Sequence, residues 1–172
     1  MLVIGIDPGT AITGYGLVRE EADGRLALVD FGAIQTPSDL PMPQRLLSTY
    51  RRLQEILLLH RPQSGAVEKL FFQRNVRTAL SVGQGRGVAL LALAQAGLEV
   101  AEYTPLEVKQ AIAGYGGADK NQVQQMVRTL LEMDSLPQPD DAADALAVAI
   151  CHLHIARYKS LFSARDSEGF EG

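Results

Sequence analysis

The sequence predicts an α/β domain, a mixed β-sheet flanked by α-helices on both faces. Three observations support this prediction: the first third reads as consecutive strands, the middle alternates between helix and strand, and the last third is helical. The length of 172 residues fits one domain with a sizeable core. The composition is 47% hydrophobic and 21% charged, which excludes wholesale disorder.

Three strands open the chain. The segment Leu2–Asp7 is apolar on both faces, as expected for a strand covered on both sides, and a Pro-Gly-Thr turn follows it. A second strand spans Thr13–Arg19, and the pair Asp23-Gly24 is a strong hairpin signal. A third strand covers Leu26–Gln35. Hairpin-linked strands of this kind predict an antiparallel half of the sheet.

In the middle of the chain, the spacing of apolar residues changes to that of a helix. Apolar residues at helical spacing predict a helix over Gln44–His60, followed by a short buried strand at Gly65–Glu68. A loop then carries two aromatic and two arginine side chains between Leu70 and Arg77. A helix rich in small residues follows from about Val76 to Ala96, and the next strand is Leu98–Tyr103. Alternation of helix and strand predicts that these strands are parallel to the first.

The sequence of the last third of the chain predicts helices and no strand. Pro105 suits the first turn of a helix ending at Ala113, and Asp119 is a plausible N-cap for the next helix. The final helix is predicted over Asp140–Tyr158, and the polar residues 159–172 are expected to form a flexible tail. Residues 1–158 therefore form one predicted domain, whose element order matches the ribonuclease H-like fold.

Composition also excludes several classes of protein. The formal net charge of −4 excludes a protein that holds nucleic acid by bulk positive charge. The single cysteine, Cys151, excludes an intrachain disulfide. The longest apolar runs, 88–94 and 145–151, are too short to cross a bilayer, and the N-terminus lacks the basic leader of a signal peptide. We therefore expect a soluble, cytoplasmic protein without membrane contact.

Four acidic residues lie at the ends of predicted buried elements. Asp7 ends the first strand, Glu68 ends the strand after the first helix, and Asp141 and Asp144 share one face of the last helix. Taken singly, each has an ordinary explanation: an acid in a first helical turn stabilises the helix dipole, and an Asp before Pro-Gly forms turns. Their common position at element ends favours a shared site.

Asp144 carries the strongest signal of the four. It lies in a run of alanine and larger apolar residues, and no Lys or Arg lies within one helical turn of it. A buried carboxylate without a partner is energetically costly, and a divalent cation would remove that cost. Ligands that are all oxygen suit Mg²⁺ or Mn²⁺.

Several segments together resemble the RuvC family of Holliday-junction resolvases, over nearly the whole chain from Met1 to Tyr158. They occur in the order and at the spacing of that family: Ile6-Asp7-Pro8-Gly9-Thr10 with Thr13-Gly14-Tyr15-Gly16, Glu68-Lys69-Leu70-Phe71, Val108-Lys109-Gln110, Lys120-Asn121-Gln122-Val123 and Asp141-Ala142-Ala143-Asp144-Ala145-Leu146.

The resemblance implies a homodimer that cuts four-way (Holliday) DNA junctions in recombination and repair by paired nicks, leaving 5′-phosphate and 3′-hydroxyl ends. It assigns catalysis and the binding of two metal ions to Asp7, Glu68, Asp141 and Asp144, with Asp7 as the natural bridging ligand. Asp140 falls outside the spacing of the family. The RuvA–RuvB branch-migration complex is the partner that the family implies.

The resemblance also assigns DNA contact to Lys109 and Lys120, and base stacking to Phe71. Residues 69–86 contain basic side chains and no acid, so this stretch is a second candidate DNA contact, and its arginines are Arg74, Arg77 and Arg86. Scattered basic residues are more often solvated surface, and an aromatic in a loop can cap the core.

Parts of the sequence are also compatible with three other functions. One is a ribonuclease H-like nuclease that acts on RNA, and another is a junction-binding module without activity, against which the four intact acids argue. The turn after Asp7 also resembles a phosphate loop of actin-like and sugar kinases, but those folds need two such domains, and this chain is about half long enough.

Overall fold

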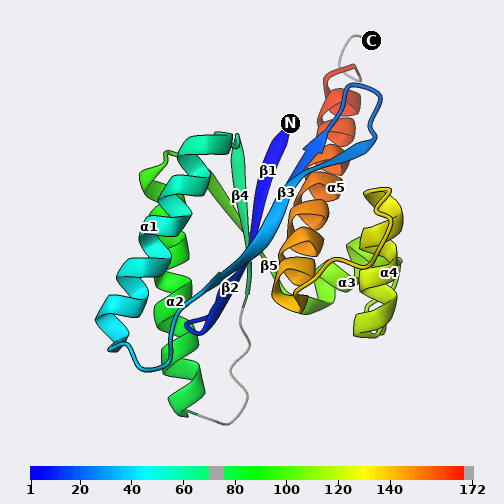
Figure 1. The fold of residues 1–172 in the computed structure, drawn as a ribbon. Helices are drawn as coiled ribbons and strands as arrows, with labels where there is room; N and C mark the ends of the chain where they lie inside the picture. The colour runs from blue at the N-terminus through cyan, green and yellow to red at the C-terminus, as the bar shows by residue number, and fades with distance from the viewer. Residues whose placement is uncertain (70–75, 169–172) are drawn as a thin grey trace.

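The computed structural model describes the backbone of residues 1–69 and 76–168, and the side chains of residues 1–69 and 79–159. A five-stranded sheet lies between two layers of helices (Figure 1). The strands are β1 (Leu2–Asp7), β2 (Ile12–Glu20), β3 (Leu26–Gln35), β4 (Ser64–Glu68) and β5 (Glu99–Tyr103). The helices are α1 (Met42–His60), α2 (Val76–Gln95), α3 (Pro105–Ala113), α4 (Lys120–Leu130) and α5 (Asp140–Glu168).

The sheet has the order β3-β2-β1-β4-β5. The pairs β1–β2 and β2–β3 are antiparallel, whereas β4 is parallel to β1 and β5 is parallel to β4. The predicted mixed sheet with helices on both faces is therefore confirmed. Eight of the ten elements also agree with the predicted bounds to within two residues, and α4 begins directly after its predicted N-cap, Asp119.

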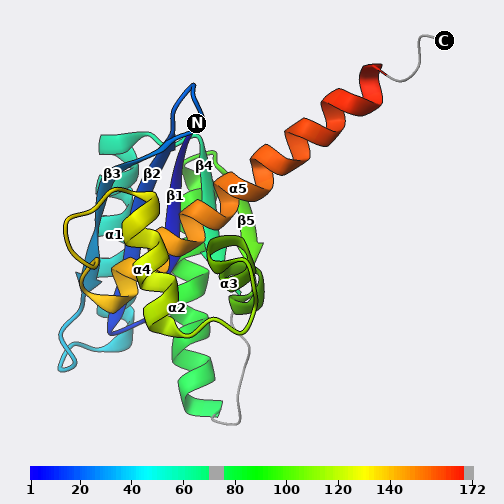
Figure 2. The same ribbon diagram turned by 90° about the vertical axis from the view of Figure 1, so that its right-hand side faces the viewer.

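Helix α5 is the exception, because it continues to Glu168 and not to the predicted Tyr158. The segment 159–168 contains no glycine or proline to end a helix, and its polar composition does not oppose a helix in solvent. Figure 2 shows α5 crossing the sheet obliquely and projecting beyond it. Residues 169–172 lie outside the described residues, and a flexible tail stays a prediction.

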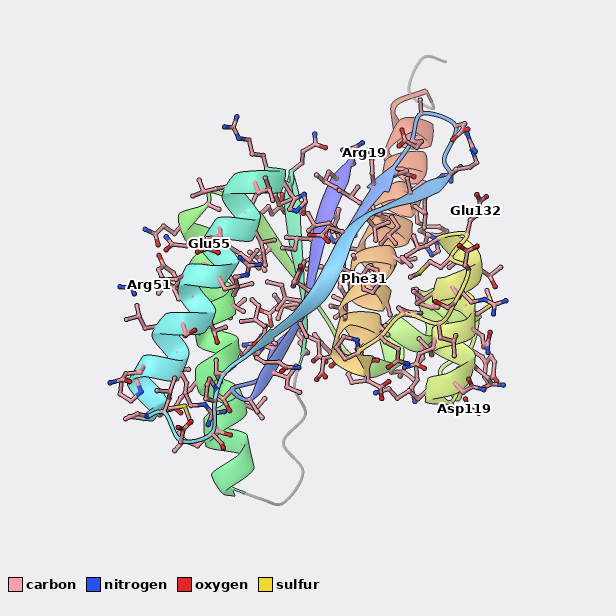
Figure 3. All side chains as sticks on the ribbon, in the orientation of Figure 1. Arg19, Phe31, Arg51, Glu55, Asp119 and Glu132 are labelled. Carbon is pink, nitrogen blue, oxygen red and sulfur yellow. The ribbon has the colours of Figure 1, made fainter. Side chains whose placement is uncertain are left out.

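The alternation of side chains along β1 divides the molecule into two cores. Leu2, Ile4 and Ile6 pack with the buried residues of α1 and α2 on one face of the sheet. Val3 packs on the other face, with the buried side chains of α3, α4 and α5. Because side chains alternate along a strand, Asp7 points to the same face as Val3, toward α5. On the outer side of α1, Figure 3 shows Arg51 and Glu55 pointing away from the sheet.

Glycines in the two central strands let α5 lie unusually close to the sheet. Gly5 of β1 pairs with Gly16 of β2. A Cβ added at Gly5 would overlap the carbonyl oxygen of Ala145 and lie 2.6 Å from the amide nitrogen of Ala149. A Cβ at Gly16 would lie 2.7 Å from the Leu146 side chain. The helix backbone therefore rests directly on the strands, and nearly every side chain from Ala142 to Leu153 is buried.

The turn after β1 is held by hydrogen bonds from two other elements. The Thr13 hydroxyl donates to the carbonyl of Gly9 at 2.7 Å. The carbonyl of Thr10 accepts from the Thr36 hydroxyl at 2.6 Å and from the guanidinium of Arg45 in α1 at 3.0 Å. These bonds fix the backbone that follows Asp7, which matters because Asp7 is the last residue of the strand.

Across the part of the chain that the structure describes, none of the helices combines the length and the apolar character that a membrane crossing requires.

We predict that Gly5→Ala destabilises the fold, because the new methyl group would collide with the backbone of α5. Overpacking of this kind lowers the free energy of unfolding by about 1–3 kcal/mol or more. Gly117→Ala is the matched control, since its nearest neighbour would be 3.5 Å away, an ordinary contact. Urea denaturation of both variants measures the difference, and equal stability of Gly5→Ala and wild type would contradict the close packing of α5.

Candidate active site

Asp7 and Glu68 end adjacent parallel strands. Ile6 is paired with Val67 in the register of β1 and β4, and the two acids are the next residue in each strand. Carboxyl ends of adjacent parallel strands meet at one edge of a sheet. Ala66, two residues before Glu68, is buried on the α5 side of the sheet, so both acids point to that side.

The N-terminal end of α5 brings the other two acids to the same edge. Gly14 is the cross-strand partner of Asp7, and a Cβ at Gly14 would overlap the backbone carbonyl of Asp141. The backbone of Asp141 therefore lies against the position beside Asp7. Asp144 follows three residues later on the same helical face, while the intervening Ala142 and Ala143 are buried.

The acids influence one another electrostatically. Burial, together with the negative charges of Glu68, Asp144 and Asp141, raises the pKa of Asp7 to about 7. Burial also raises the pKa of Glu68, with an additional contribution from Asp144. These shifts mean that the carboxylates repel one another in a partly desolvated space. A cation among them would be strongly favoured.

Lys120, the first residue of α4, reaches this group of acids. Its Nζ lies 3.2 Å from Oδ2 of Asp144 and 3.1 Å from Oδ2 of Asp140. The expectation that Asp144 is buried without a basic partner is therefore wrong, because the partner comes from another helix. Asp144 is also less enclosed than expected, with 36% of its side chain exposed. Burial still raises the pKa of Asp144, and Lys120 opposes that rise.

The donor set fits a divalent cation, although the side chains are not arranged around one. Within the described residues, no three Asp, Glu, His or Cys side chains stand close enough together to hold an ion. The acids nevertheless supply only oxygen atoms, which suits Mg²⁺ or Mn²⁺. Burial and the repulsion of neighbouring acids raise the pKa of both Asp7 and Glu68, and Lys120 opposes that rise.

A cavity of about 180 Å³ opens beside the acids. Glu68 and Asp144 line it, together with the two predicted DNA-contacting lysines, Lys109 and Lys120. Its remaining wall is apolar and consists of side chains from α3, α4 and α5: Pro105, Val108, Val123 and Ala147. The two lysines thus lie next to the acids, from which they are far apart in sequence.

The predicted aromatic and arginine contacts are placed differently. Phe71 and Arg74 lie outside the described residues, and the side chain of Arg77 in α2 is also outside them. Arg86 forms an ion pair with Glu102 of β5. Because Tyr103, the next residue, packs on the α5 side, Glu102 and Arg86 lie on the opposite face of the sheet from Asp7. Arg86 therefore has a structural partner away from the acids, which argues against its predicted DNA contact.

Sequence analysis did not identify two sets of polar contacts, one beside the acids and one farther along α5. Gln124, which is buried, donates from Nε2 to Oδ1 of Asp140 at 3.1 Å. His152 of α5 lies between the Ser64 hydroxyl at 2.8 Å and the Tyr103 hydroxyl at 2.7 Å. No local pattern in the sequence signals these contacts, since each joins elements whose packing must be known first.

Comparison with known proteins identifies the family. A protein-family model described as "Crossover junction endodeoxyribonuclease RuvC" matches residues 3–152 of this chain. The chain belongs to the RuvC family. The crossover junction endodeoxyribonuclease RuvC of Syntrophomonas wolfei is 54% identical over 171 residues, covering 99% of each chain.

Two solved structures of RuvC from Thermus thermophilus are similar to this chain. The first has a TM-score of 0.86 at 39% identity, covering 92% of this chain and 97% of the other. The second is RuvC "in complex with Holliday junction substrate", with a TM-score of 0.85 at 37% identity, covering 92% and 96% of the two chains. The predicted ribonuclease H-like fold is confirmed by this similarity. As a member of the RuvC family, the chain is a metal-dependent endodeoxyribonuclease that resolves Holliday junctions.

We predict that Asp7→Asn stabilises the metal-free protein at pH 8. The raised pKa means that the Asp7 carboxyl favours folding only when protonated, so this contribution is present below about pH 4 and is lost as the pH rises through about 7. The amide cannot ionise. It should increase the free energy of unfolding at pH 8 by up to about 4 kcal/mol, and much less at pH 4.

Chemical denaturation in the presence of a chelator, at pH 8 and pH 4, measures this effect. Asp39→Asn, an exposed acid in the loop before α1, is the control and should change stability little at either pH. A destabilised Asp7→Asn protein at pH 8 would show that burial and repulsion do not govern this carboxylate.

Proposed function

We propose that Asp7, Glu68, Asp141 and Asp144 are the catalytic residues and hold the metal, two Mg²⁺ or Mn²⁺ ions. One observation carries this proposal: acids from β1, β4 and α5 meet at one edge of the sheet, where burial and mutual repulsion raise the pKa of Asp7 to about 7. A structural role in a turn or helix cap would not require three separate elements to bring their acids together.

The roles of the residues follow from their positions. Divalent ions bound there would activate a water molecule and stabilise the departing 3′ oxygen of the phosphodiester. The charges of Glu68, Asp144 and Asp141 all contribute to the raised pKa of Asp7, which supports Asp7 as the ligand shared between the two ions. The lysines Lys109 and Lys120 line the adjoining cavity, where they can bind the phosphates of the DNA backbone.

Further DNA contacts are proposed for side chains that the structure does not describe. Phe71 lies three residues beyond Glu68 in the sequence, and an aromatic ring there can stack on a base freed from pairing, which contributes about 1–3 kcal/mol. Arg74 and Arg77 belong to the same basic stretch. Since the whole chain has a net charge of −4, binding through these few cations should weaken strongly with added salt.

We also propose that the protein is a homodimer that uses α2 as its interface. Leu80 and Leu91 on this helix are 66% and 58% exposed. Gly83 and Gly87 lie between them at helical spacing, and among the described residues nothing lies within 4 Å of a Cβ added at either glycine. These four positions form one apolar stripe that a second copy can cover. A twofold dimer would present two active sites to the two opposing strands of a junction.

The remaining partner and the location rest on the family resemblance. A branch-migration complex of RuvA and RuvB, and a cytoplasmic location, are proposed on that basis.

We predict that replacing Asp7, Glu68, Asp141 or Asp144 by the corresponding amide abolishes cleavage and retains junction binding. Loss of a partner that only orients a metal ligand already lowers activity about 10–100-fold, so loss of a ligand should exceed about 100-fold. Cleavage of a synthetic four-way junction in Mg²⁺ measures activity, and gel retardation in Ca²⁺ measures binding. Asp39→Asn is the control that should cut at the wild-type rate.

The same assay should include a linear duplex and an RNA hairpin. Preferential cleavage of the junction supports the proposed substrate, and preferential cleavage of the hairpin would favour a nuclease that acts on RNA. A variant such as Asp144→Asn that cuts at nearly the wild-type rate would overturn the assignment of the four acids.

We predict that the protein sediments as a dimer at micromolar concentration without DNA, and that Leu91→Glu converts it to a monomer by placing a charge in the apolar stripe. Leu106→Glu is the matched control, because Leu106 in α3 is similarly exposed, at 55%, but lies away from α2. Sedimentation velocity distinguishes the two states. A monomeric wild-type protein, or equal dimers of both variants, would contradict an interface on α2.

A further inference from the structure

The ammonium of Lys120 is shared between two carboxylates of α5. Asp140 and Asp144 lie four residues apart, so their side chains are neighbours on one face of the helix. Lys120 Nζ is 3.1 Å from Asp140 and 3.2 Å from Asp144.

Asp140 is held in place by a second contact. Gln124, a buried residue of α4, donates to Oδ1 of Asp140 at 3.1 Å, while Oδ2 faces Lys120. Lys120 and Gln124 are themselves four residues apart on α4, so one face of α4 binds both oxygens of Asp140.

The arrangement has a consequence for the proposed metal site. The ammonium of Lys120 forms an ion pair with Oδ2 of Asp144. A divalent cation that binds Asp144 must therefore compete with that ammonium. Two cations on one carboxylate repel each other, so the ammonium must have another anion close by if the ion is to bind well. Asp140 is that anion, and it already accepts Lys120 without any movement of the backbone.

We propose that Asp140 is a positioning residue for the metal site: it retains Lys120 while a divalent cation takes Asp144. The inference rests on the proposed role of Asp144 as a metal ligand. In this proposal Asp140 acts through Lys120 and is not itself a metal ligand. Without Asp140, Lys120 would bind Asp144 alone and compete more strongly with the cation.

A double-mutant cycle on Mn²⁺ binding tests the proposal without reference to cleavage. Isothermal titration calorimetry of the full chain without DNA compares wild type, Asp140→Asn, Lys120→Gln and the double variant. Asp140→Asn should weaken Mn²⁺ binding about two- to five-fold, the range expected for a partly exposed ion pair. Lys120→Gln should strengthen binding, and in its background Asp140→Asn should have no further effect.

The cycle separates this role from the alternatives. If Asp140→Asn weakens Mn²⁺ binding equally with and without Lys120, Asp140 acts only as a nearby negative charge and the proposal is wrong. If the double variant loses Mn²⁺ binding altogether, Asp140 is itself a ligand, which also overturns it. Asp140→Glu keeps the negative charge, so its affinity for Mn²⁺ should stay within about two-fold of the wild-type affinity.

Two controls distinguish failure of this inference from failure of the proposed metal site. Asp7→Asn should abolish high-affinity Mn²⁺ binding, and Asp39→Asn should leave it unchanged. If Asp7→Asn binds Mn²⁺ as wild type does, the metal site itself is wrongly assigned and the Asp140 inference falls with it. If Asp7→Asn loses binding while Asp140→Asn does not weaken it, only the role of Asp140 is overturned.

Discussion

The contact between α5 and the two central strands is the constraint on which the rest of the structure depends. Gly5, Gly14 and Gly16 leave room for the backbone of α5, and any side chain at these positions would overlap the helix. The close approach fixes the helix at its N-terminal end, where Asp141 lies against Gly14, the cross-strand partner of Asp7. A helix held farther from the sheet would still form a core, but it would carry Asp141 and Asp144 away from the strand acids.

Much of this architecture could be predicted from the sequence, because its signals are local. The strand periodicity of Leu2–Asp7 and the helical periodicity of α1 depend on residues a few positions apart, and these elements were predicted to within two residues. The four acids were also predicted as a group, since the carboxyl ends of adjacent parallel strands must meet. The end of α5 was not predicted correctly, because a polar segment without glycine or proline carries no signal that distinguishes an exposed helix from an irregular tail.

Contacts between elements could not be predicted in the same way. Asp144 has no basic neighbour along its own helix, yet Lys120 reaches it from α4, which packs beside α5. Arg86 was assigned to a positive stretch by its sequence position, whereas the phase of α2 directs it to Glu102 on the other face of the sheet. In both cases the decisive quantity is the rotation of one helix against another element. That rotation depends on the whole core and not on any short segment.

The charge of the site links metal binding to DNA binding. Asp7, Glu68, Asp141 and Asp144 repel one another, and Lys120 is the cation that opposes this repulsion at Asp7. A DNA phosphate brought to the same edge would meet the same negative field, and the repulsion between like charges a few ångströms apart is large in a partly desolvated space. On the proposed function, divalent cations must therefore neutralise the acids before a phosphate can approach. The lysines of the adjoining cavity then bind the flanking backbone, so an acidic protein can hold DNA through a few correctly placed charges.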